Sequence, residues 1–216
     1  YLEPTALNYI GEAFLDPNVN VLCGRSRIFE GVNKTLRFSN GTDVYEANLE
    51  KTIALARIDQ PETYFRKSCI DKVGFLNEKL HYVMDREWWI RYLLEFGLQG
   101  IVRYDDNILV NFRLHEQSKT ISSSKHFLKE GFGLSFLFAQ YAENLAFKKA
   151  IVSLGVNIET KFEITKSNSQ SVHWQKVCNY NALYYADYYY YIFDYLTSNL
   201  FLSSVVEEEL SKKEKF

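Results

Sequence analysis

One stretch of the sequence decides the expected fold: residues 80–97 read LHYVMDREWWIRYLLEFG. From Asp85 onward, aromatic and apolar side chains recur every three or four positions, which predicts one apolar face of a helix. This face consists of Trp88, Trp89, Tyr92, Leu93 and Phe96. Gly97 follows where a C-cap glycine would end the helix. Asp85 stands where the helix should begin, so we expect its carboxylate to cap free backbone N–H groups and to stay ionised.

A carboxylate at the start of such a helix fits two roles. It can be an N-cap alone, or it can be a general base at the mouth of a cleft, and both can hold at once. The spacing within the helix does not separate these roles. The surrounding blocks of sequence favour the base.

Four blocks carry a family resemblance in the order in which they occur. Residues 60–67 read QPETYFRK, residues 72–78 read KVGFLNE, residues 84–91 read MDREWWIR and residues 112–120 read FRLHEQSKT. Together they resemble family 2 inverting glycosyltransferases of the GT-A fold. In that family the aspartate that opens this helix takes the proton of the acceptor hydroxyl. The resemblance therefore implies that Asp85 is the general base.

The resemblance covers residues 1–120 and implies an α/β fold there. It predicts the acceptor-side half of a GT-A domain, a nucleotide-diphospho-sugar transferase-like mixed sheet with flanking helices. The family builds its donor site from an N-terminal nucleotide-binding half and an Asp-x-Asp motif, and the sequence contains neither. We therefore expect the chain to begin just after such a motif, and this chain alone to be inactive. Residues 121–216 predict a helical C-terminal region.

Local patterns predict the individual elements. Alternating or β-branched runs favour strands, and Pro61 favours an extended entry into the third of them. Two predicted strands near residue 106 are separated by a turn at Asp105 and Asp106. The strands are expected at 19–29, 33–39, 63–66, 101–104 and 107–112. Further helices are expected at 68–73, at 125–145 and, as one or two helices, at 174–210, with a polar segment at 157–170.

Composition limits the function classes. With a net charge of −2 over 216 residues, we expect no nucleic-acid partner. The 3 cysteines lie far apart and favour a reducing, cytoplasmic compartment. No apolar run reaches the roughly 18 residues that span a membrane. The helical region permits peripheral association with the inner face of the membrane, homodimerisation, or packing on the first domain.

Three residues are candidates for the acceptor site. Trp88 can stack on the apolar face of a sugar or can be a core residue. Gln60 can hydrogen-bond a substrate or hold its own loop in place. His81 lies on the loop before Asp85, where it can shape the acceptor mouth.

The last block supplies the candidates for the donor side. In relatives of this resemblance, a histidine at the position of His115 reaches the divalent metal, Mn²⁺ or Mg²⁺, on the donor diphosphate. Cations next to it contact phosphate, a role that would fall to Arg113 and Lys119. The alternative is that His115 is an ordinary loop residue.

The sequence as a whole predicts an inverting, metal-dependent glycosyltransferase of surface polysaccharide biosynthesis. It would move a sugar from a nucleotide diphosphate sugar to a hydroxyl group of a glycan acceptor. Two alternatives stay open because a fold does not fix a function. One is a non-catalytic glycan-binding module, and the other is a helical interaction or scaffold module.

Overall fold

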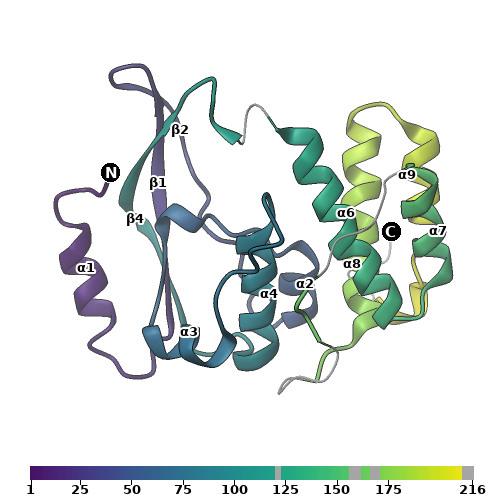
Figure 1. The fold of residues 1–216 in the computed structure, drawn as a ribbon, viewed down its shortest axis with the longest axis horizontal. Coiled ribbons are helices and arrows are strands. Elements are labelled where there is room, and N and C mark those ends of the chain that lie inside the picture. Colours follow the sequence, from purple (N-terminus) through teal and green to yellow (C-terminus); the bar gives the residue numbers. More distant parts are fainter. Residues whose placement is uncertain (120–122, 156–161, 166–170, 211–216) are drawn as a thin grey trace.

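The computed structural model describes residues 1–119, 123–155, 162–165 and 171–210. A mixed four-stranded sheet is built around β1 (Val21–Glu30) (Figure 1). One edge of β1 pairs in parallel with β4 (Ile101–Leu114), and the other edge is shared by β3 (Thr63–Phe65) and β2 (Lys34–Phe38), both antiparallel. This arrangement confirms the predicted α/β class with a mixed sheet.

Strand β4 differs from its prediction. The expected turn at Asp105 and Asp106 is wrong, because one strand runs through both residues. The β1–β4 register moves from the pair Cys23–Arg103 to the pair Arg25–Ile108, so β4 fits more residues into this interval than β1. A bulge takes up the extra residues and keeps the strand continuous.

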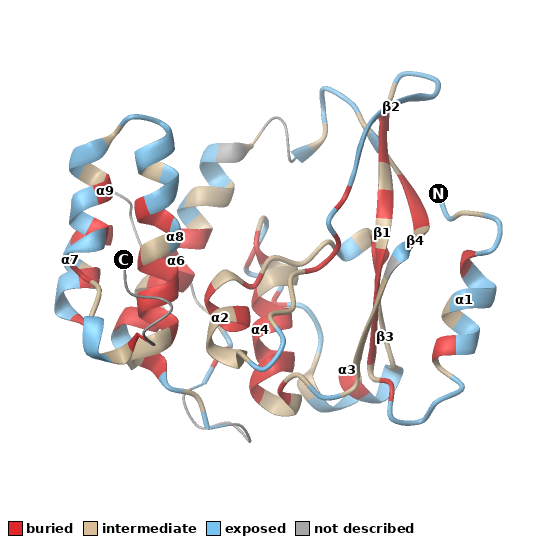
Figure 2. Ribbon diagram, turned by 180° about the vertical axis from the view of Figure 1, so that it is seen from behind, coloured by how far each residue is buried: buried red, intermediate tan, exposed pale blue. Residues whose placement is uncertain are grey.

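Helices cover both faces of the sheet. Alternate residues of β1 point to opposite faces: Leu22 packs under α1 (Ala6–Ala13), whereas Val21 and Cys23 belong to the large core on the other side. That second face carries α3 (Lys67–Val73), α4 (Met84–Phe96) and α2 (Leu49–Leu55) (Figures 1 and 2). The buried residues coloured in Figure 2 run through β1 and α4 into the helical region.

The entry to β3 is a correction to the sequence prediction. Gln60 and Pro61 do not lie in an extended segment but in a 3₁₀ turn, η1 (Gln60–Glu62). Proline is tolerated in the first helical turn, since its missing N–H would have no partner there. The turn carries Glu62 into the interior, where its side chain is buried.

The C-terminal region is helical, as predicted. It contains α6 (Ser124–Tyr141), α7 (Leu145–Ser153), α8 (Trp174–Tyr191), α9 (Tyr195–Leu202) and the turn η2 (Glu207–Glu209). Helix α6 ends at Tyr141 rather than at residue 145, because Asn144 caps a new helix by accepting the N–H of Phe147 over 2.8 Å. The polar segment predicted at 157–170 lies mostly outside the described residues.

The helical region shares one core with α2 and α4. Asn181 of α8 donates to the carbonyl of Ala54 over 2.8 Å, and Asn48 donates to the hydroxyl of Tyr180 over 2.9 Å. These contacts fix α8 against both ends of α2. Among the described helices, none has the length and apolar character that crossing a membrane requires.

Helix α4 is enclosed on all sides rather than amphipathic. Its predicted face is buried at Trp88, Trp89, Tyr92 and Leu93. Residues on its other sides, such as Glu87, Ile90 and Leu94, are also buried, and α4 shares one core with α2 and the helical region. Glu87 and Arg91 of this helix form a buried ion pair of 3.0 Å. The helix is therefore a central element between the sheet and the C-terminal helices.

Candidate functional site

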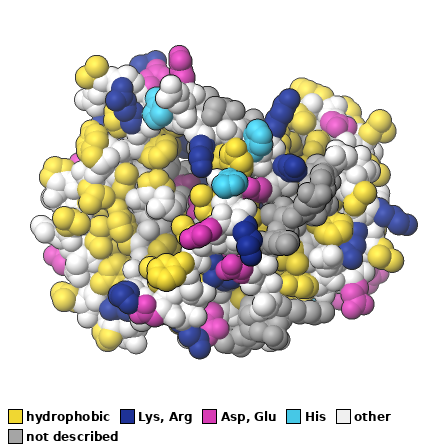
Figure 3. All heavy atoms as spheres, in the orientation of Figure 1, with side chains coloured by type: hydrophobic (Ala, Val, Ile, Leu, Met, Phe, Trp, Pro, Cys, Tyr) yellow, Lys and Arg dark blue, Asp and Glu magenta, His cyan; other side chains and the backbone are white. Residues whose placement is uncertain are grey.

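A cavity of about 770 Å³ lies where the strands, the loop before α4 and the helical region meet. Charged side chains of both signs and histidines gather at the centre of the face seen in Figure 3. They lie next to a hollow between the sheet and the C-terminal helical region. The cavity has a polar side and an apolar side. We call this cavity the central cleft.

Asp85 lies at the central cleft, half-buried, as the second residue of α4. The N-cap of α4 is Val83, so the expectation that Asp85 caps the helix is wrong in detail. One carboxylate oxygen accepts the backbone N–H of Arg86 over 2.7 Å. Burial raises the pKa of Asp85, and the neighbouring Asp59 raises it further, although the N–H and the charge of Arg86 oppose this. The carboxyl is therefore a better proton acceptor than an exposed aspartate.

Residues 57–62 supply further groups of the polar side. Arg57 forms ion pairs with Asp43 over 2.6 Å and with Asp59 over 2.8 Å, which fixes Asp59 beside the cleft. Glu62 is buried and accepts the hydroxyl hydrogens of Ser26 and, over 2.5 Å, Ser39. Burial raises the pKa of Glu62, and these hydrogen bonds lower it in part. The cleft thus holds three carboxyl groups in different environments.

Aromatic and aliphatic side chains form the apolar side. They include Tyr82, from the loop before α4, Phe127 and Leu128 of α6, and Tyr188 of α8. The ring of Tyr82 stacks on His126 at a centroid distance of 5.1 Å and meets Phe127 edge to face at 5.1 Å. We call these four lining residues the aromatic wall. Sugar rings expose C–H faces that pack on such surfaces.

Four of the residues predicted from the sequence meet at the central cleft: Asp85, Gln60, His81 and Lys119. Gln60 and His81 are exposed at its edge. Lys119 donates to the carbonyl of His81 over 3.3 Å, and its ammonium group lies 5.7 Å from the ring of Tyr82. The structure therefore places Lys119 beside the acceptor candidates.

Three predicted residues are not among the described residues that line the cleft: Trp88, Arg113 and His115. Trp88 is 5% exposed and donates its indole N–H to the carbonyl of Gly74 over 2.6 Å. It is a core residue here, which is the second of the two roles that the sequence left open for it. Arg113 lies at a separate hollow beside Phe29.

His115 is exposed in a turn closed by hydrogen bonds with Ser118 of 2.8 and 3.1 Å. Within the described ranges, no group of three or more His, Cys, Asp or Glu side chains could hold a metal ion. Among these residues His115 offers one imidazole, a ligand type that Mn²⁺ and similar ions accept. We assign no reaction step to a metal.

Three residues at or near the cleft had no role in the sequence prediction. Glu62 follows Pro61, and a proline-led turn is the local signal that could have marked it. Tyr188 and Glu130 come from the helical region, and their positions depend on how α6 and α8 pack. No local pattern indicates that packing.

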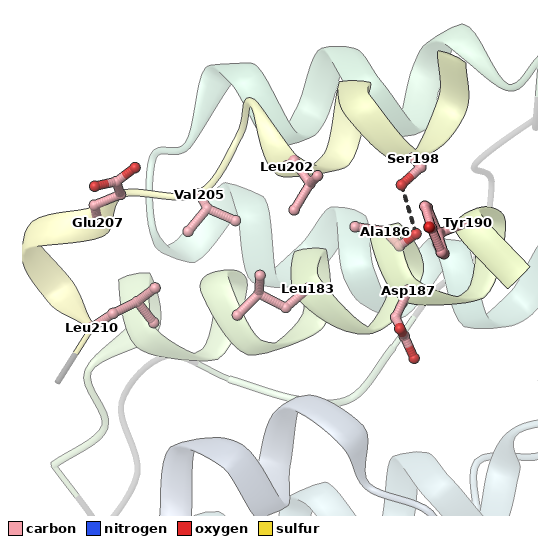
Figure 4. A pocket seen from close by; sticks show the side chains of 9 residues that line it. All are labelled: Leu183, Ala186, Asp187, Tyr190, Ser198, Leu202, Val205, Glu207 and Leu210. Carbon is pink, nitrogen blue, oxygen red and sulfur yellow. Dashed lines mark hydrogen bonds between the residues drawn. The ribbon is translucent and has the colours of Figure 1, made fainter. Parts of the chain in front are cut away.

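A second cavity, of about 570 Å³, lies between α8, α9 and η2. Figure 4 shows leucine and valine side chains around it, while Asp187 points away from it. Ser198 is already bonded, donating to the carbonyl of Ala186 over 2.8 Å. This cavity lacks convergent polar groups, so the central cleft is the better candidate for chemistry.

Comparisons with models of protein families, with curated proteins and with solved structures find no match to this chain.

Proposed function

We propose that this chain carries the acceptor side of an inverting glycosyltransferase of GT-A type, with Asp85 as the general base. The observation that carries this proposal is the position of Asp85. Its half-buried carboxyl, with a raised pKa, lies in one cleft with a polar loop and an aromatic wall. The four sequence blocks that resemble family 2 glycosyltransferases support the same reading.

The proposed reaction is an in-line displacement. The oxygen of an acceptor hydroxyl attacks the anomeric carbon of the donor sugar, and the bond from that carbon to the diphosphate oxygen breaks. The hydroxyl proton moves to Asp85, and the nucleoside diphosphate leaves with the bonding electron pair. A positioned base of this kind contributes about 10²–10⁴-fold to the rate.

The acceptor would lie between the aromatic wall and the polar loop. Tyr82 and Tyr188 offer apolar surface for the sugar ring, and Gln60 and His81 offer hydrogen bonds at the edge. The donor would be a nucleotide diphosphate sugar and the acceptor a surface glycan. We also propose a divalent metal, Mn²⁺ or Mg²⁺, and cytoplasmic catalysis at or near the inner face of the membrane.

The alternative of a glycan-binding module shares the aromatic wall but does not need the base. The position of Asp85 in the cleft favours the enzyme, because the transfer reaction needs a carboxylate that can accept a proton there. Measurement of sugar transfer distinguishes the glycosyltransferase from the glycan-binding module, because only the enzyme transfers sugar.

The test is acceptor-dependent release of nucleoside diphosphate by the full-length gene product. Sugar nucleotides based on UDP, GDP and dTDP are each incubated with Mn²⁺ and a panel of glycan acceptors. Asp85→Asn should lower the transfer rate about 10²–10⁴-fold. The control is Asp71→Asn, whose aspartate pairs with Lys67 on an exposed surface and should have no effect on the rate. Transfer at the wild-type rate by Asp85→Asn would rule out the base.

A further inference from the structure

Helix α6 sends one acidic side chain to the loop that precedes Asp85. The two carboxylate oxygens of Glu130 accept three consecutive backbone N–H groups. The first is that of His81 over 3.1 Å, and those of Tyr82 and Val83 follow over 2.8 and 3.0 Å. These partners lie 47 to 49 residues away along the chain. Glu130 therefore connects the helical region to the start of α4.

Consecutive N–H groups that converge on one point form an anion-binding concavity. Here the anion is the carboxylate of Glu130, and bonds of N–H to a charged acceptor are stronger than neutral ones. Val83 is the N-cap of α4, and its side chain cannot cap the helix. Glu130 thus fixes the backbone at the point where the helix begins.

Other contacts from the same side hold the same loop. Lys119 donates to the carbonyl of His81 over 3.3 Å, and His126 of α6 stacks on the ring of Tyr82. Residues that follow β4 in the sequence therefore hold both the backbone of this loop and the ring of Tyr82. Asp85 follows Val83 by two residues, so the direction of its carboxylate depends on these contacts.

We propose that Glu130 is the positioning residue for Asp85. The carboxylate of Glu130 would hold the loop of residues 81–83 so that Asp85 faces the acceptor hydroxyl in the central cleft. The helical region would then take part in catalysis through this hydrogen-bonded clamp. This role rests on the proposed function, because it needs a reaction for Asp85 to perform.

The test combines hydrogen exchange with kinetics on the full-length protein. Glu130→Ala should raise the exchange rates of the amides of residues 81–83 at least about tenfold, since each loses its acceptor. It should lower kcat by up to about 10²-fold with little change in the donor KM, because the base is displaced rather than removed. Glu130→Gln keeps the length and one acceptor oxygen, and should recover part of both losses.

The matched control is Glu12→Ala, which removes an exposed glutamate from α1 and should change neither exchange nor rate. Unchanged protection of residues 81–83 in Glu130→Ala would overturn the clamp. Faster exchange with an unchanged kcat would overturn the positioning role while the proposed function stands. A wild-type protein that transfers no sugar to any acceptor would instead overturn the proposed function and this role with it.

Discussion

Arg91 and Glu87 form an ion pair inside the protein, with Nε of Arg91 3.0 Å from a carboxylate oxygen of Glu87. The side chains are 9% and 0% exposed. Arg91 also donates to the carbonyls of Val73 and Phe75, each over 2.7 Å. One arginine thus ties helix α4 to the loop that follows α3. Because each charge has a partner of opposite sign, the two charged residues can be buried in the core.

Arg91→Ala should lower the free energy of unfolding by about 3–5 kcal/mol, because it leaves the Glu87 carboxylate buried without its cation. Lys67→Ala is the control, since it breaks the exposed pair with Asp71 and should cost about 0–1 kcal/mol. Urea denaturation of both variants measures the difference. Equal losses would show that burial of the Glu87–Arg91 pair does not govern its contribution.

Asp85→Asn should make the protein more stable at neutral pH, not less. Burial raises the folded-state pKa of Asp85 above its ordinary value of 3.8, so the charged form is disfavoured in the folded state. Below pH 3.8 the protonated Asp85 carboxyl contributes its full share to the free energy of unfolding of the wild-type protein. This contribution is lost as the pH rises through the pKa of Asp85 in the folded state. The advantage of Asp85→Asn should therefore grow over that window and then level off.

Asp194→Asn should show the opposite pH dependence. The Asp194 side chain accepts hydrogen bonds from Thr197, which lower its pKa. Wild type gains stability from this group above its unfolded pKa and loses that stability as the pH falls through the folded pKa. Thermal unfolding of both variants from pH 3 to pH 8 checks the two signs. Parallel curves for the two variants would contradict the assigned pKa shifts.

Local patterns predicted the elements of residues 1–114 well, because alternation and capping act over a few residues. Two of the exceptions have physical causes that lie outside those windows. The bulge in β4 is set by its long pairing with β1, which overrides the turn preference of two aspartates. The burial of Glu87 depends on its pair with Arg91 and on the backbone N–H of Glu163, which lies 76 residues further along the chain. Tertiary contacts decided both.

The sequence predicted only part of the candidate site, because local patterns do not show how distant elements pack. Asp85, Gln60, His81 and Lys119 lie at or near the ends of elements that the sequence marked, and the structure brings them to one cleft. Trp88 could not be assigned from helical spacing, because both faces of α4 are buried. Tyr188 and Glu130 lie far from Asp85 in the sequence, and only the packing of α6 and α8 brings them to the loop or the cleft.

His115→Ala should raise the Mn²⁺ concentration needed for half-maximal transfer more than it changes the acceptor KM. The reason is the position of His115 in the block after β4, where the family resemblance places a metal ligand. Titration of Mn²⁺ against rate in both proteins measures this. His126→Ala is the control, because His126 stacks on Tyr82 and should alter the acceptor KM instead. An identical metal dependence would remove His115 from the ligands.

Tyr188→Ala should weaken acceptor binding without removing the base. Tyr188 is 37% exposed and reaches the central cleft from α8, so its ring offers apolar surface to a sugar while Asp85 stays in place. Loss of one aromatic contact is worth about 0.5–1.5 kcal/mol, or roughly a 2- to 12-fold rise in the acceptor KM. We expect kcat at saturating acceptor and the donor KM to stay close to their wild-type values.

Tyr191→Ala is the matched control for this prediction. Tyr191 ends the same helix, is 71% exposed and is not among the described residues that line the cleft. Equal effects of Tyr188→Ala and Tyr191→Ala would point to a general disturbance of α8 and not to a sugar contact. An unchanged acceptor KM in Tyr188→Ala, with the transfer reaction intact, would place the acceptor on the opposite side of the cleft. The aromatic wall would then be the inner surface of the helical region and no part of the binding site.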